Sequence, residues 1–253
     1  VDGDGDQARD GATGSWGRVP AVSGLDRNTL WASAFADELA RAGVREICVA
    51  PGSRSTPLVL AFAMHGSFRL RVHLDERSLG FFALGIGKAS GVPAVVITTS
   101  GTAAANLFPA VIEASHGETP LLVLTADRPH RMRDGDANQA IDQLRLFGPF
   151  VREFFDVAPA AVEGPALRHL RSLAGRAVAS AVGAPAGPVH LNFPFDQPLE
   201  PIGSVELPTR FEQAHPRAAL GRPESVPYVD VTPRRPQVGA GELDLLEERL
   251  RVA

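Results

Sequence analysis

Short, largely apolar segments alternate with longer helical patterns along this chain, and this alternation constrains the possible folds more than any other feature. The segments are "REICVA" (45–50), "RLRVHL" (69–74), "PAVVITT" (93–99), "PLLVLTA" (120–126) and "GPVHLNFP" (187–194). Strands that are apolar on both sides and separated by helices are typical of parallel sheets covered on both faces. The pattern therefore predicts an α/β fold, a doubly wound and mainly parallel sheet, over residues 28–202.

The helical segments between these strands have recognisable ends. The first is expected over 28–43, with Asn28 as its N-cap and Gly43 as its stop. A second opens at Pro57, which suits a first helical position because the N–H there has no partner within the helix. Further helices are expected after Glu76, over 103–116 and over 165–182.

The two ends of the chain lack this pattern. Residues 1–27 are rich in Gly and Asp without periodicity, which predicts a disordered extension. The "DGDGD" run there lacks the Gly and the final Glu of a calcium loop. From residue 203 the sequence turns Pro-rich until a helical pattern begins at 241. We interpret 203–253 as a linker and the start of a truncated second domain, and the chain as a fragment.

Composition excludes several classes of function. The net charge of −4 provides no basic surface for nucleic acid or for an anionic membrane. No apolar run reaches the roughly 18 residues that span a bilayer, and the N-terminus has no apolar signal core. Cys48 is the single cysteine and lies in an apolar strand, where core packing in a reducing compartment is favoured over a reactive thiol. We therefore expect a cytoplasmic protein.

Polar and small residues gather in the loops that follow the predicted strands. These loops are "PGSRST", "DERS", "TSGT" and "ADRP". Because ligands of doubly wound sheets bind beyond the carboxyl ends of the strands, the loops predict where a site lies. The histidines show no metal-ligand spacing, so no metal site is predicted. Ser100, in "TTSGT", lacks the pattern of a nucleophile elbow.

Glu76 stands where the second loop becomes a helix that is apolar on nearly every side. In the simplest interpretation it is a favourable charge near the helix dipole. However, Asp75 already supplies such an acid. Three glycines, Gly80, Gly85 and Gly87, cost the helix about 1 kcal/mol each, which predicts close packing against another backbone. A carboxyl group in these surroundings could stay protonated, or share a proton with a ring nitrogen.

Two arginines in these loops are suited to anions. Arg54 in "PGSRST" and Arg128 in "ADRP" follow two different strands, and either guanidinium could hold a carboxylate or phosphate. An ordinary strand-to-helix turn and an exposed structural cation are the simpler interpretations. Neither a Walker loop nor a dinucleotide-binding fingerprint is present. We expect Arg131 and Arg133 to be solvated.

Five motifs, in one order and spacing, carry a resemblance to a known family. They are "APGSRSTPL", "DERSLGFFALGIGKASG", "TTSGTAAANLFPAVIEA", "LTADRP" and "ANQAIDQ". Over residues 28–200 the chain resembles the N-terminal, pyrimidine-binding domain of the thiamine-diphosphate-dependent 2-succinyl-5-enolpyruvyl-6-hydroxy-3-cyclohexene-1-carboxylate (SEPHCHC) synthases of menaquinone biosynthesis. The resemblance implies thiamine diphosphate and Mg²⁺ as cofactors. It also implies a reaction that decarboxylates 2-oxoglutarate and joins the remaining unit to isochorismate.

The resemblance also implies roles for particular residues. Glu76 matches the catalytic acid that binds N1′ of the cofactor's aminopyrimidine ring. The positions that match substrate-binding residues are Ser53, Arg54, Arg128, Asn138 and Gln139. In the family, the Mg²⁺ and diphosphate ligands lie in a C-terminal domain that nothing after residue 200 matches, and the active site forms between two subunits. We therefore expect a homo-oligomer in which this chain supplies half of a site and has little turnover alone.

Two other interpretations stay open. Another thiamine-dependent carboligase or decarboxylase, similar to acetohydroxyacid synthase, would share the Glu at the helix start, but "PGSRSTP" and "ADRP" argue against it. A free-standing, non-catalytic binding domain is the second, and the helical pattern that begins at 241 argues against that.

Overall fold

The structure is a computed structural model that describes residues 24–133, 135–232 and 239–252. Its centre is a six-stranded sheet in the order β2-β1-β3-β4-β6-β5, with every neighbouring pair parallel. The strands are β1 (Glu46–Val49), β2 (Arg69–Val72), β3 (Ala94–Thr98), β4 (Leu121–Asp127), β5 (Glu153–Asp156) and β6 (Pro188–Pro194). All five predicted strands are present. The sequence missed β5, a four-residue edge strand whose half-buried side chains give no continuous apolar signal.

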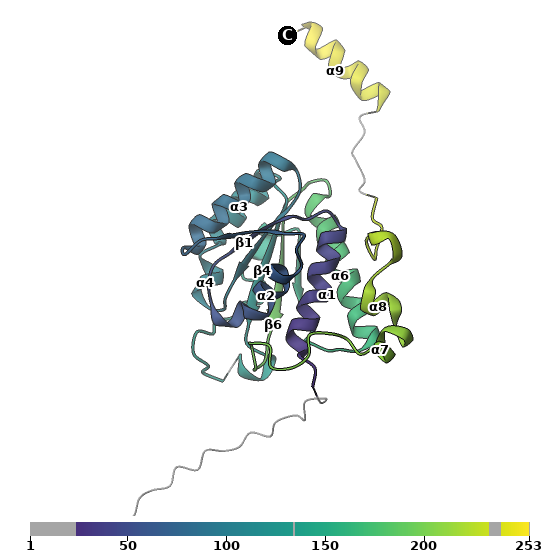
Figure 1. Cartoon of the computed structure of the whole chain (residues 1–253). Coiled ribbons are helices and arrows are strands. Elements are labelled where there is room, and N and C mark those ends of the chain that lie inside the picture. The colour runs from purple at the N-terminus through teal and green to yellow at the C-terminus, as the bar shows by residue number, and fades with distance from the viewer. Residues whose placement is uncertain (1–23, 134, 233–238, 253) are drawn as a thin grey trace, which may run out of the picture.

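Helices cover both faces of the sheet, which confirms the doubly wound α/β prediction (Figure 1). On one face, α1 (Arg27–Arg41), α2 (Thr56–Met64) and α6 (Gly164–Val182) pack around a core that includes Trp31 and Phe35. On the other, α3 (Glu76–Ser90) and α5 (Phe108–His116) pack around Leu79 and Phe147. The remaining helices are α4 (Thr102–Ala105), α7 (Thr209–Ala214), α8 (Pro216–Leu220) and α9 (Ala240–Val252).

The start of α1 differs from the prediction. Its N-cap is Asp26, whose Oδ1 accepts a hydrogen bond of 2.7 Å from the N–H of Thr29. Asn28, the predicted cap, instead donates from its side chain to the carbonyls of Asp196 and Pro198. An aspartate accepts this bond as well as an asparagine does, so the local sequence did not discriminate between them. Helix α1 thus begins at Arg27, one residue before the predicted cap.

The predicted helix over 103–116 is interrupted. The structure has α4 and α5 there, separated by Asn106 and Leu107, with Pro109 in the first turn of α5. Proline has no N–H to continue the preceding helix, and it fits best where a helix starts anew. The break sets Asn106 at the carboxyl edge of the sheet.

The Pro-rich segment after 203 is more structured than its sequence pattern indicates. Leu25 pairs with Ser204, α8 lies against α6, and α7 packs against α8 (Figure 1). Helix α9 matches the helical pattern expected from 241 and stands apart from the sheet. The expectations for residues 1–23, including "DGDGD", fall outside the described residues.

Two predictions from composition can be compared with the structure. Cys48 is fully buried in the core, as predicted, and burial, assisted by the charge of Glu46, raises the pKa of its thiol to about 12. Among the described residues, no helix has the length and apolar character needed to cross a membrane.

Candidate active site

The parallel sheet brings the predicted loops together at its carboxyl edge. Following the strand order β2-β1-β3-β4, these loops are 73–76, 50–55, 99–102 and 128–133. Since each loop leaves the same end of its strand, side chains far apart in the sequence become neighbours there. The residues that the sequence singled out lie in these loops or in the segment that continues from the last of them.

Glu76 is the first residue of α3, beside the Asp75 N-cap. Its side chain is half-buried, and its Oε2 accepts a hydrogen bond of 3.2 Å from Nδ2 of Asn106. The sequence predicted a carboxyl group more fully shielded from water than this. Apolar residues near Glu76 in the sequence, among them Leu74 and Phe82, are exposed as well.

An exposed apolar surface extends from β2 onto the first turns of α3. We call it the β2–α3 surface, and its members are Val72, Leu74, Phe81 and Phe82. Leu74, two residues before the start of α3, is 88% exposed, which is unusual for a leucine. Exposed large apolar side chains that gather on one surface mark a place where another molecule binds.

The three glycines of α3 do not share one role. A Cβ on Gly80 would lie 2.9 Å from the Cβ of Ala110, and one on Gly87 would lie 2.4 Å from the carbonyl oxygen of Pro120. These two confirm the predicted close packing. Gly85 does not, because a Cβ there would meet nothing within 4 Å.

Arg54 is buried, with 7% of its surface exposed. Its Nη1 donates to the carbonyl of Phe195 at 2.8 Å, while its Nε is buried without a partner among the described residues. Burial, together with the charge of Arg128, lowers the pKa of the Arg54 guanidinium. Among the described residues, neither arginine forms an ion pair with a carboxylate. The edge therefore holds two neighbouring positive charges suited to an anion.

Arg128 and Gln139 are both bound to Ser100 in the turn after β3. Arg128 donates from Nη1 to Ser100 Oγ and from Nη2 to the carbonyl of Asn138. Ser100 Oγ in turn donates to the carbonyl of Gln139 at 3.1 Å, and Gln139 Nε2 donates to the Ser100 carbonyl at 3.0 Å. The Ser100 turn thus holds two of the predicted residues, Arg128 and Gln139. Gln139 is nevertheless exposed, as are Ser53 and Asn138.

The expectation for Arg133 was wrong. Its side chain is only 12% exposed and pairs with Asp127 at 3.0 Å and Asp156 at 2.9 Å. These carboxylates lie at the ends of β4 and β5, where burial requires a counter-charge. Burial alone would raise the pKa of Asp156, but the bond and charge of Arg133 outweigh it and lower that pKa. Arg131 is exposed, as expected, and pairs with Asp196.

A buried polar network beneath the edge was not predicted. Thr125 Oγ1 donates to Asn192 Oδ1 at 2.8 Å, and Gln143 Nε2 donates to the same oxygen at 2.9 Å. Asn192 Nδ2 donates to Asp127 Oδ2 at 2.8 Å. The sequence did contain a signal for this network, because polar residues occur inside otherwise apolar strands. Such residues need hydrogen-bond partners when they are buried.

The network also fixes the protonation of His190. The single hydroxyl hydrogen of Thr125 goes to Asn192, so Thr125 must accept its 2.8 Å bond from Nε2–H of His190. Nδ1 of His190 then carries no hydrogen, and it is buried without a partner. Burial lowers the pKa of His190 to about 3, so the ring is neutral at physiological pH.

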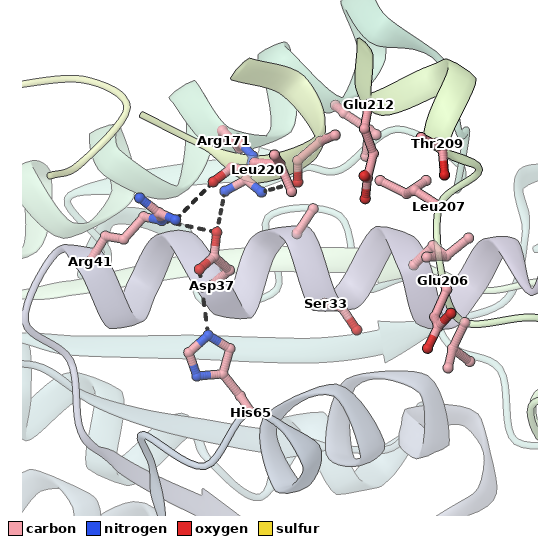
Figure 2. Close-up of a pocket in the computed structure, with 15 residues that line it drawn as sticks. Ser33, Asp37, Arg41, His65, Arg171, Glu206, Leu207, Thr209, Glu212 and Leu220 are labelled. Atoms are coloured by element: carbon pink, nitrogen blue, oxygen red, sulfur yellow. Dashed lines mark hydrogen bonds and ion pairs between the residues drawn. The ribbon is translucent and has the colours of Figure 1, made fainter. Parts of the chain in front are cut away.

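A hollow of about 620 Å³ lies elsewhere, between α1, α6 and residues 205–220 (Figure 2). Asp37 pairs there with Arg41 and Arg171, whereas Glu206 and Glu212 form no ion pair among the described residues. Arg171 donates to Asp37 at 2.6 Å and Glu38 at 3.0 Å, and also to the carbonyls of Ala218 and Ala219. This cluster fastens α8 to α1 and α6, and none of the predicted site residues lines the hollow. Among the described residues, no cluster of His, Cys, Asp or Glu could hold a metal ion.

Comparisons with a family model and with individual proteins both find thiamine-diphosphate-dependent enzymes. Residues 31–146 match the family described as "Thiamine pyrophosphate enzyme, N-terminal TPP binding domain". Proteins named 2-succinyl-5-enolpyruvyl-6-hydroxy-3-cyclohexene-1-carboxylate synthase are similar over most of the chain. The one from Roseiflexus castenholzii is 56% identical over 80% of this chain and 35% of its own length. The one from Halobacterium salinarum is 53% identical over 81% and 35%, and that from Geobacillus kaustophilus is 47% identical over 87% and 38%. The chain thus spans about a third of the length of these relatives.

Proposed function

We propose that the chain, whose residues 31–146 match the N-terminal TPP binding domain of the thiamine pyrophosphate enzymes, is the N-terminal part of a SEPHCHC synthase. The complete enzyme decarboxylates 2-oxoglutarate and joins the remaining unit to isochorismate in the cytoplasm. The similarity to synthases of that name over about 80% of the chain supports the proposal.

One observation carries the proposal furthest, namely the pair of arginines at the carboxyl edge. Arg54 and Arg128 lie close enough for one charge to lower the pKa of the other, and neither is neutralised by an ion pair among the described residues. Both proposed substrates carry carboxylates, which match guanidinium groups in charge and geometry. Gln139, Ser53 and Asn138 add polar groups around the same anions.

The residues at this edge fit the pyrimidine end of thiamine diphosphate. Glu76 has a half-buried carboxyl group at a helix start, and the hydrogen bond from Asn106 holds one of its oxygens in place. The carboxyl group can share a proton with a ring nitrogen and so hold the pyrimidine in orientation. When bound, the cofactor supplies the carbon nucleophile for the 2-oxo acid. We propose that ligands for its diphosphate and for Mg²⁺ come from another part of the complete protein.

The β2–α3 surface supports the second half of the proposal, a homo-oligomer with the site at a subunit interface. Phe81 and Phe82 are exposed on α3, the helix that begins at Glu76, and we propose that the subunit that covers them also shields that carboxyl group. Desolvation would then strengthen every charge interaction in the site.

The test is an assay of the full-length protein with thiamine diphosphate and Mg²⁺. We expect CO₂ release from 2-oxoglutarate and product formation with isochorismate, and no turnover by residues 1–253 alone. Product formed from pyruvate instead would indicate an acetohydroxyacid-synthase-like carboligase. Normal turnover by the 253-residue chain would overturn the proposal of a shared site.

A further inference from the structure

Gln143 makes contacts that the proposed function leaves unexplained. It lies at the end of the loop that carries Asn138 and Gln139, and it is 1% exposed. Its Oε1 accepts from the N–H of Gly101 at 2.8 Å. Its Nε2 donates to the carbonyl of Ala126 at 3.2 Å and to Asn192 Oδ1 at 2.9 Å. One buried amide therefore connects the ends of β3, β4 and β6.

These bonds reach Arg128 by two routes. On one side, Gln143 holds Gly101, which follows Ser100, and Ser100 Oγ accepts from the Arg128 guanidinium. On the other side, Asn192 donates to Asp127 Oδ2, and Asp127 Oδ1 accepts from the backbone N–H of Arg128 at 2.7 Å. Both the backbone and the side chain of Arg128 thus depend on the same amide.

We propose that Gln143 is a positioning residue, which fixes the Ser100–Gly101 turn and thereby the orientation of Arg128 and Gln139 toward an acidic substrate. This inference rests on the proposed function of those two residues. Gln143 does not touch the substrate.

The site requires an amide in particular. Asn192 gives both of its N–H groups to carboxylates, so its Oδ1 accepts only and needs donors. A carboxylate at position 143 would place a second acceptor against that oxygen and against the Ala126 carbonyl. A methionine would keep the length of the side chain and lose every bond.

The experiment compares Gln143→Met and Gln143→Glu with two controls in the full-length protein. Arg171→Met removes an equally buried polar group far from the edge, and Gln213→Met changes an exposed glutamine. KM for each substrate and kcat are measured below the unfolding temperature of every variant. Amide exchange of the peptide that covers Gly101 is followed by mass spectrometry.

We expect both Gln143 variants to raise KM for one acidic substrate about tenfold or more, with kcat changed less than about threefold, because substrate orientation is lost before chemistry is. The exchange at Gly101 should accelerate about tenfold in Gln143→Met, which has no acceptor for that N–H. Arg171→Met should lower the thermal midpoint without either effect. An unchanged KM in folded Gln143→Met, or an equal change in Arg171→Met, would overturn the inference.

Two outcomes separate this inference from the proposed function. If the unsubstituted protein lacks synthase activity, the proposed function fails, and the exchange rate still decides whether Gln143 holds the turn. If the Gln143 variants do not fold, amide exchange at Gly101 in the unsubstituted protein tests the inference. Gly101 must then be as protected as the amides of β4, and fast exchange would refute the bond to Gln143.

Discussion

The side-chain amide of Asn106 donates a 3.2 Å hydrogen bond to Oε2 of Glu76, across 30 residues of sequence. The bond exists because the chain breaks between α4 and α5, which sets Asn106 at the carboxyl edge. It orients the carboxyl group that we propose for proton sharing with the cofactor.

Replacing Glu76 with Gln should remove this proton sharing while leaving the hydrogen-bonded helix start in place. We expect the domain to fold normally and turnover of the full-length enzyme to fall about 10²–10⁴-fold, the usual contribution of general acid–base catalysis. A steady-state assay measures the fall in turnover, and circular dichroism checks that the domain folds normally. Glu113→Gln, at an exposed site on α5, is the matched control. A rate within a few-fold of the original would exclude Glu76 from the chemistry.

Replacing Arg54 with Ala should mainly weaken substrate binding. A hydrogen bond to a charged group contributes about 1.5–3 kcal/mol, so KM for one carboxylate substrate should rise roughly 10–100-fold. Some loss of stability is also expected, because Arg54 donates to the carbonyl of Phe195. Kinetics with each substrate varied in turn would show which one the arginine holds. Unaltered KM for both would place Arg54 outside the site.

The glycines of α3 provide a matched pair for stability. Gly87→Ala would push a Cβ to 2.4 Å from the Pro120 carbonyl oxygen, and overpacking of this kind costs about 1–3 kcal/mol. Gly85→Ala meets open space in the single chain, and helix propensity should then stabilise it by up to about 1 kcal/mol. Urea denaturation of residues 1–253 measures both. Equal effects from the two substitutions would contradict the packing seen here.

The stability of the protein should depend on pH through His190. Its pKa is about 3 in the folded chain and near 6.5 when unfolded, so the unfolded state binds more protons at mildly acidic pH. This contribution is fully present above pH 6.5 and is lost as the pH falls toward 3. His190→Gln keeps a donor for Thr125 and cannot titrate, so its unfolding free energy should vary less between pH 6.5 and 4.5. The same slope in both proteins would refute the burial of a neutral imidazole.

The sequence by itself determined the class of fold and the edge of the sheet at which the candidate site residues gather. Apolar strands separated by helices require a parallel sheet covered on both faces, and such a sheet collects its strand-end loops at one edge. Arg54, Glu76 and Arg128 could be found in this way because each follows a strand that local pattern reveals. Edge strand β5 could not be found, since pairing on one side leaves only a weak pattern.

Only the tertiary structure decided which polar groups meet. The burial of Arg133 against Asp127, the opposite surroundings of Gly85 and Gly87, and the amide of Gln143 between three strands all depend on partners distant in sequence. Local sequence sets propensity and hydrophobic pattern. Hydrogen-bond partners are instead chosen by packing, which acts between residues that the pattern cannot relate.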